Sequence, residues 1–230
     1  MKLLAQILNF LFQSLWFLLH GLIPRKIGRG DRLIHYSPRI VAQLLLSYLF
    51  GGPRIALLGD SNSAVFSRWT VMIRFDVVAV SIGVPGTRMD QWADFFETKT
   101  GRFVLWLLRP AIDFVNLGGN NALHRKAEII ESASSRVKSF LPESWIILIP
   151  PIHVDYFSIL VPPDSLQKDI NRINKALRKE WAPRVIDPSP LVDRDSDGIP
   201  DEGALGDPVH YAIRVVKEMQ AGIEYLALDR

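Results

Sequence analysis

Cysteine is absent from the 230-residue chain, and negative charge is scarce near its N-terminus. Without cysteine there are no disulfides and no thiolate chemistry, which suits a cytoplasmic or an extracytoplasmic protein. Residues 1–40 carry six Lys and Arg but one acidic residue, so their net charge is +5 and that of the remaining 190 residues is −2. A nucleic-acid-binding domain carries positive charge on its folded body, so this distribution excludes nucleic acid as the expected partner and favours anionic lipid.

The basic N-terminal region also contains a long uncharged apolar run, residues 3–23. As a helix this run would be about 31 Å long, close to the thickness of a bilayer's hydrocarbon core. Its polar side chains recur at helical spacing, so a helix lying in the membrane interface, or packed on the protein's own surface, is an alternative to a spanning helix. We predict that residues 1–37 are a membrane-associating segment with a basic linker, followed by a domain over 38–230.

Short apolar, β-branched runs alternate with segments of helical periodicity through this domain. The expected strands are 54–58, 76–82, 112–117, 145–149 and 184–187. The expected helices are 38–50, 62–73, 88–98, 124–140, 165–181 and 208–226. Strands that are apolar on both faces and alternate with helices indicate a parallel sheet covered on both sides. The predicted class is therefore α/β, a flavodoxin-like three-layer α/β/α sandwich around a parallel sheet of about five strands.

Polar or glycine-rich turns follow three of these strands, and a fourth precedes the last helix. The four turns are Gly59-Asp60-Ser61-Asn62, Gly83-Val84-Pro85-Gly86-Thr87, Gly118-Gly119-Asn120-Asn121 and Asp207-Pro208-Val209-His210. The carboxyl ends of parallel strands meet at the edge of the sheet where ligands bind. Together the turns supply a hydroxyl, an imidazole, a carboxylate and an amide, which are the groups that acyl transfer requires.

The four blocks resemble those of the SGNH, or GDSL-type, hydrolase family, in the same order along the chain. They read GDSN, the glycine of VPGT, GGNN and DPVH, and the resemblance covers roughly residues 54–215. It implies that Ser61 is the nucleophile, that His210 is the general base and that Asp207 orients His210.

The same resemblance implies an oxyanion hole. Its donors would be the backbone N–H groups of Ser61 and Gly86 and the side-chain amide of Asn120. Gly83 competes with Gly86 for the second block, although the following threonine makes Gly86 the better match. The third block carries Asn121 where the family often has aspartate, and this departure leaves the amide donor unchanged.

The residues support these roles independently of the resemblance. Asp207 followed by proline reads as a helix N-cap with Pro at the first helical position, and a residue three positions on can meet the Asp207 side chain. His210 stands at that position. His124 and His153 are rival bases, but neither has a carboxylate three residues upstream.

Acidic residues alternate in the segment DRDSDGIPDE, residues 193–202. Asp193, Asp195, Asp197 and Asp201 stand at positions 1, 3, 5 and 9, with glycine at position 6, as in calcium loops. Position 12 is alanine, so this is not a full EF-hand, and a solvated acidic loop is the alternative reading. We predict a structural calcium site at these four aspartates.

The sequence predicts a membrane-associated serine esterase of SGNH type that needs no cofactor for catalysis. Its substrate would be a carboxylic ester of a lipid, an acylated glycan or a small alcohol. An acyl transferase on the same fold, or a non-catalytic, calcium-stabilised binding module, are the alternatives. A weak calcium site is most useful where calcium is abundant, so we expect an extracytoplasmic domain, although the positive-inside rule favours the cytoplasm.

Overall fold

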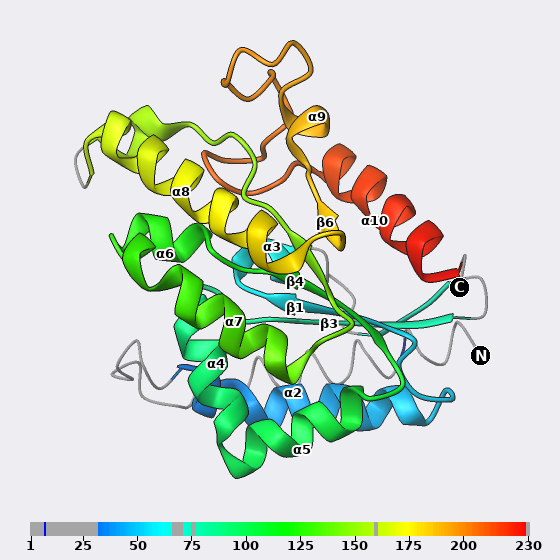
Figure 1. The fold of residues 1–230 in the computed structure, drawn as a ribbon. Coiled ribbons are helices and arrows are strands. Elements are labelled where there is room, and N and C mark those ends of the chain that lie inside the picture. Colours follow the sequence, from blue (N-terminus) through cyan, green and yellow to red (C-terminus); the bar gives the residue numbers. More distant parts are fainter. Residues whose placement is uncertain (1–6, 8–31, 66–70, 75–76, 159–160, 229–230) are drawn as a thin grey trace.

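The computed structural model describes residues 7, 32–65, 71–74, 77–158 and 161–228. Within them, one sheet has the strand order β2-β3-β1-β4-β5-β6 (Figure 1). The strands are β1 (Ile55–Gly59), β2 (Val71–Arg74), β3 (Val77–Gly83), β4 (Ile112–Asn116), β5 (Trp145–Ile147) and β6 (Val185–Ile186). Five strands are parallel and β2 pairs antiparallel with the edge of β3, so the predicted α/β class with a five-stranded parallel sheet is confirmed.

Helices cover both faces of the sheet. They are α2 (Arg32–Tyr48), α3 (Ser61–Val65), α4 (Met89–Glu97), α5 (Lys99–Leu108), α6 (Gly119–Leu123), α7 (Ile130–Phe140), α8 (Pro163–Trp181), α9 (Ser189–Val192) and α10 (Ile213–Leu228). Successive residues of a strand point to opposite faces. Ala56 and Leu58 of β1 accordingly join the core cluster of α2, α4, α5, α7 and α8, whereas Ile55 and Leu57 join that of α9 and α10. In Figure 1, α2 and α5 lie below the sheet and α10 above it.

The first described helix begins earlier than predicted. We expected a helix over 38–50, but α2 runs from Arg32 to Tyr48 and contains Pro38. A proline inside a helix leaves the carbonyl four residues earlier without its usual donor. Here that carbonyl belongs to Ile34, and the hydroxyl of Ser37 donates to it at 2.7 Å. This bond and the burial of α2's apolar side extend the helix into the predicted linker.

Two further elements differ from expectation. The helix predicted over 62–73 is wrong: α3 ends at Val65, and residues 71–74 form the edge strand β2. A strand of only four residues is too short for its alternation of side chains to distinguish it from part of a helix. Helix α5 was not predicted at all. It begins after Thr98, whose Oγ1 accepts the backbone N–H of Gly101 at 3.0 Å as an N-cap.

The predicted membrane-associating run, residues 3–23, lies outside the described residues except for Ile7. Its association with a membrane therefore stays a prediction. Among the residues that the structure describes, no helix is both long and apolar enough to cross a bilayer.

Candidate active site

Strand β1 ends on a glycine because its neighbours leave no room for a side chain. A Cβ on Gly59 would lie 2.2 Å from the carbonyl oxygen of Asn116 and from Oγ of Ser63. Helix α3 then begins at Ser61, at the carboxyl edge of the sheet. The first N–H groups of a helix have no partner within the helix, and they carry positive potential that suits a developing oxyanion.

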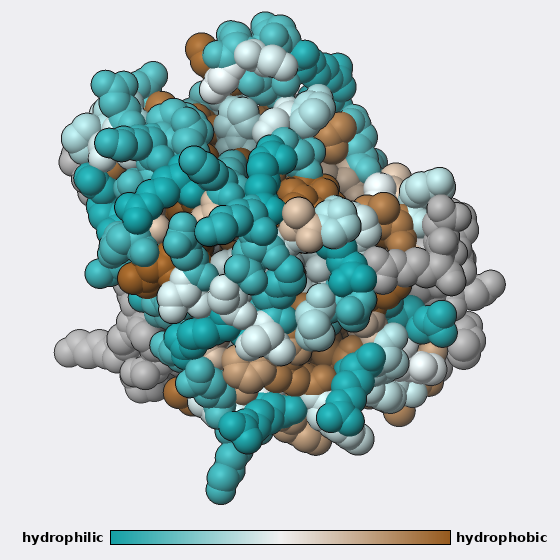
Figure 2. Space-filling view, viewed as in Figure 1, coloured by the Kyte–Doolittle hydropathy of each residue, from teal (hydrophilic) through white to brown (hydrophobic). Residues whose placement is uncertain are grey.

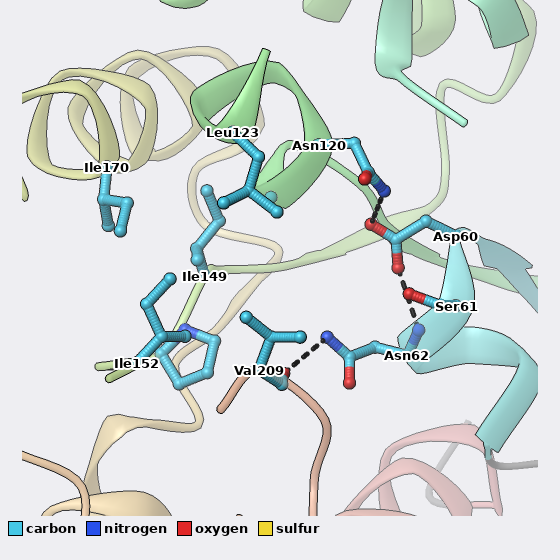
Figure 3. Close-up of a pocket in the computed structure, with 11 residues that line it drawn as sticks. Asp60, Ser61, Asn62, Asn120, Leu123, Ile149, Ile152, Ile170 and Val209 are labelled. Carbon is cyan, nitrogen blue, oxygen red and sulfur yellow. Dashed lines mark hydrogen bonds between the residues drawn. The ribbon is translucent and has the colours of Figure 1, made fainter. Parts of the chain in front are cut away.

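The carboxylate of Asp60 joins the first of the four turns to the third. Its Oδ1 accepts the backbone N–H of Asn62 at 2.9 Å, and its Oδ2 accepts the side-chain amide of Asn120 at 3.0 Å (Figure 3). Burial raises the pKa of Asp60 from 3.8 to about 6, although these bonds and the charge of His210 act to lower it. At neutral pH the carboxylate is therefore mostly ionised. It holds one N–H of the Asn120 amide and leaves the second N–H for another acceptor.

Ser61 and Asn120 line one pocket of about 40 Å³. Asp60, Ser61 and Asn120 stand on one side of it, and apolar side chains face them across the space (Figure 3). The apolar lining consists of Leu123, Ile149, Pro150, Ile152, Ile170 and Val209. The structure thus brings two of the predicted catalytic and oxyanion residues together at a pocket whose opposite wall is apolar.

A larger and more polar groove of about 400 Å³ adjoins this pocket. The two share Ile149, Pro150 and Ile170 in their walls. The polar side chains along the groove come from α8 and from the segment that contains the acidic loop. They are Gln167, Asn171, Asn174, Asp187, Ser189, Asp193 and Ser196. A substrate with a small apolar part and a larger polar part would fit this pair of spaces.

Asp207 and His210 meet as predicted, but not at the start of a helix. Oδ2 of Asp207 lies 2.6 Å from Nδ1 of His210, and its Oδ1 accepts the backbone N–H groups of Val209 and His210 at 2.9 Å each. These are the bonds expected of an N-cap. The chain nevertheless turns back to form an antiparallel bridge from Leu205 to Tyr211, so the predicted helix over 208–226 begins only at 213.

The bonds to Asp207 fix its charge and the orientation of the imidazole. Burial alone would raise the pKa of Asp207, but the hydrogen bonds from Val209 and His210 lower it below its usual range. An anionic Asp207 can only accept, so Nδ1 of His210 carries the proton that lies between them. Nε2 of the neutral ring is then left as the acceptor that a general base needs.

Asn62 connects the two parts of the site, and sequence reasoning gave it no role. Its Nδ2 donates to the carbonyl of Val209 and its Oδ1 accepts the N–H of Tyr211, both at 3.3 Å. These two bonds flank His210, which itself lies outside the pocket lining. The signal that could have found Asn62 is its position directly after Ser61.

The second turn lies beside the first. The N–H of Val84 donates to the carbonyl of Gly59 at 2.9 Å, and Gly86 adopts a φ of 73°, which favours glycine. Gly86 lies outside the pocket lining, so its role as an oxyanion donor stays a prediction. Asn121 is fully buried, and its Oδ1 accepts the N–H of Met89 at 3.0 Å. Asn121 therefore holds the start of α4 and is a structural residue.

Three of the four predicted calcium ligands come together. One carboxylate oxygen from each of Asp193, Asp195 and Asp197 lies within 4.8 Å of the others. The N–H of Asp197 lowers the pKa of Asp195, but the neighbouring carboxylates outweigh it, and the net shift is upward. Asp201 lies outside this group, and its carboxylate accepts the N–H of Arg194 at 3.4 Å. Calcium binding stays a prediction that the three clustered carboxylates fit.

Comparisons with known proteins find similar folds among solved structures only. No protein-family model matches the chain, and no curated protein does. Solved structures are similar. A GDSL-like lipase from Bacteroides thetaiotaomicron matches at 16% identity and a TM-score of 0.57, covering 87% of this chain and 98% of that one. LAE5, an alpha/beta hydrolase enzyme from the Lake Arreo metagenome, matches at 13% identity and a TM-score of 0.54, covering 76% and 94%.

A member of the lipolytic protein G-D-S-L family from Veillonella parvula also matches, at 15% identity and a TM-score of 0.50, covering 77% of this chain and 97% of that one. Likeness at such identities concerns the fold. The chain therefore has the SGNH hydrolase fold that its four turns predict, and the chemistry of the site rests on its own residues.

Proposed function

We propose that this chain is a serine esterase. The observation that carries the proposal is the arrangement around Asn62. Ser61 and Asn120 face the apolar wall of a small pocket, and the side chain of Asn62 bonds to the turn that holds Asp207 and His210. Asn62 therefore links Ser61, at the edge of the sheet, to the surface turn that carries the proposed base and its carboxylate partner.

In the proposed reaction, Nε2 of His210 removes the proton of the Ser61 hydroxyl as Oγ attacks the ester carbonyl. Asp207 stabilises the imidazolium that forms. The backbone N–H groups of Ser61 and Gly86 and the free N–H of Asn120 stabilise the oxyanion. His210 then gives its proton to the leaving alcohol and later activates the water that hydrolyses the acyl-enzyme.

The shape of the site supports a short acyl group. A cavity of about 40 Å³ holds only a few non-hydrogen atoms, so an acyl chain of about two to four carbons fits it. The adjoining polar groove would take the alcohol part of the ester. Among the predicted substrates, this division favours acetylated or otherwise short-chain esters of polar alcohols over long-chain lipids.

Hydrolysis of p-nitrophenyl esters of increasing chain length tests the proposal. We expect activity on acetate and butyrate, and we expect Ser61→Ala to lower kcat by about 10⁴-fold or more. Ser139→Ala is the matched control, because its exposed hydroxyl bonds only within α7. Equal activity of Ser61→Ala and wild type would overturn the assignment of the nucleophile.

Two other results would point to the alternatives. Faster release of p-nitrophenol with an added polar alcohol, together with formation of its ester, would identify an acyl transferase. A folded wild type that hydrolyses no ester and does not react with a serine-directed phosphonate would favour the binding module.

A further inference from the structure

Exposed hydrophobic side chains gather on two helices far from the candidate active site. Eleven large hydrophobic side chains are exposed in the described part of the chain, and six belong to α2, to α5 or to the residue after α2. These six are Ile34, Leu45, Tyr48, Leu49, Phe103 and Trp106, with exposed fractions from 41% for Tyr48 to 70% for Leu49. Single exposed hydrophobics are ordinary on a protein surface, whereas a cluster marks an interaction site.

The two helices form one surface. The hydroxyl of Tyr48 donates to the carbonyl of Leu107 at 2.8 Å, which joins the C-terminal ends of α2 and α5. Phe103 and Trp106 stack with their ring centroids 5.7 Å apart. The helices lie together below the sheet in Figure 1, and Figure 2 shows brown side chains low on the molecule, in the region of α5. We call this surface the α2–α5 face.

The charge of the α2–α5 face has one sign. Neither α2 nor α5 contains Asp or Glu. Lys99 and Arg102 are exposed on α5, and exposed Arg54 and Arg109 follow the two helices in sequence. Apolar and aromatic side chains bordered by cations are typical of surfaces that bind anionic lipid, because the rings enter the interface while the cations meet the head groups.

The path of the chain favours the same partner. Helix α2 begins at Arg32, and only eight residues separate it from the apolar run 3–23. If that run is held at a membrane, the short connection keeps α2 close to the lipid. We propose that the folded body contacts an anionic bilayer through the α2–α5 face. The candidate pocket is lined by residues that lie outside the α2–α5 face.

The absence of cysteine allows a direct test on the full chain. Single variants Leu49→Cys and Phe103→Cys place an environment-sensitive fluorophore such as NBD on the face. Tyr156→Cys and Tyr225→Cys are matched controls, because both tyrosines are exposed outside α2 and α5. Each labelled protein is mixed with vesicles of phosphatidylcholine alone, or of equimolar phosphatidylcholine and phosphatidylserine.

We expect the labels at 49 and 103 to shift to the blue, to brighten severalfold with phosphatidylserine, and to be quenched by spin-labelled lipid. The labels at 156 and 225 should not change. In the Phe103→Cys background, changing Lys99 and Arg102 to glutamine should weaken the response, by about fivefold in apparent affinity for each charge if each contributes about 1 kcal/mol.

Two results would overturn the proposal. If the protein sediments with vesicles while all four labels remain in water, then residues 1–31 hold it and the face does not touch lipid. If the labels at 49 and 103 are already protected without vesicles, and more so at higher protein concentration, then a second copy of the chain covers the face.

Discussion

The two halves of the candidate active site are built by different means. The half that contains Ser61 rests on the sheet edge, and its anchoring carboxylate, Asp60, is only 4% exposed. The half that contains His210 is a surface turn, where the side chains of Asp207 and His210 are 49% and 29% exposed. The first half is positioned by burial, and the second by a few hydrogen bonds that solvent can reach.

The two halves therefore differ in how their charged groups affect the stability of the fold. Burying the charge of Asp60 opposes folding, because desolvation raises its pKa to about 6. Asp207 keeps its charge at little cost, since its pKa is lowered. We therefore expect substitutions in the first half to change both stability and rate, and those in the second half to change mainly rate.

The largest effect after loss of Ser61 should come from the general base. His210→Ala should lower kcat for p-nitrophenyl acetate by about 10³- to 10⁴-fold without changing Tm appreciably. His153→Ala is the matched control, because the backbone N–H of His153 donates to the carbonyl of Pro208 beside the same turn. A comparable loss in His153→Ala would mean that the base is wrongly assigned.

Asp60→Asn tests the buried half, because it should lower the rate while it raises stability. The variant loses the charge that holds the Asn120 amide, so we expect kcat to fall by about 10- to 100-fold. It also removes a buried charge, so the free energy of unfolding at pH 8 should rise by about 1–3 kcal/mol. Asp155→Asn, at an exposed carboxylate, should change neither quantity.

The pH dependence of this gain has a definite sign. The pKa of Asp60 is about 6 in the folded chain and 3.8 as a free carboxyl, so between these values the folded state binds more protons. The contribution of Asp60 to stability therefore falls as pH rises through this window and is constant above it. Urea denaturation at several pH values should show that the free energy of unfolding of Asp60→Asn, relative to that of wild type, rises between pH 4 and about 6. A variant less stable than wild type at pH 8 would contradict this account.

Asn62→Ala should loosen the exposed half and have a smaller effect. It removes both side-chain bonds to the residues beside His210, each worth about 1 kcal/mol. We expect kcat to fall by about tenfold, amide hydrogen exchange to quicken at residues 209–211, and the free energy of unfolding to fall by about 2 kcal/mol. If exchange is unaltered there, Asn62 does not hold the turn.

Calcium should have the smallest effect on rate. If the clustered aspartates bind it, calcium at a hundred times its Kd should raise Tm by about 5–10 °C and change kcat less than about twofold. Replacing Asp195 and Asp197 by asparagine should abolish the rise in Tm, and magnesium should not reproduce it. If Tm is the same in calcium as in a chelator, the aspartates form a solvated acidic loop and not a calcium site.

Residues that are close in sequence carried most of the successful predictions. Each parallel strand is a short apolar run, and glycine and polar residues mark each turn in the sequence. The contacts that complete the site could not be read in this way, because Asp60 and Asn120 are 60 residues apart. The start of the last helix was misplaced because Asp207 makes the same local bonds in a turn as in an N-cap.

Helix α5 was missed for a related reason. A glycine at its third position reads as a helix breaker, but a Cβ on Gly101 would lie 1.9 Å from the carbonyl oxygen of Phe95. The close approach of α4 and α5 requires that glycine, and sequence patterns do not report such an approach.

The bonds of Asn62 also bear on when the protein becomes active. They join Asn62 to Val209 and Tyr211, which follow it by 147 and 149 positions. Nearly the whole chain must therefore be made before the turn that carries His210 can dock beside Ser61. Contacts of such long separation form late, after the local elements have folded. A chain still on the ribosome, with its last strands and the acidic loop unmade, would expose its serine without a base. Esterase activity would then report completed folding, and not merely the presence of the sheet.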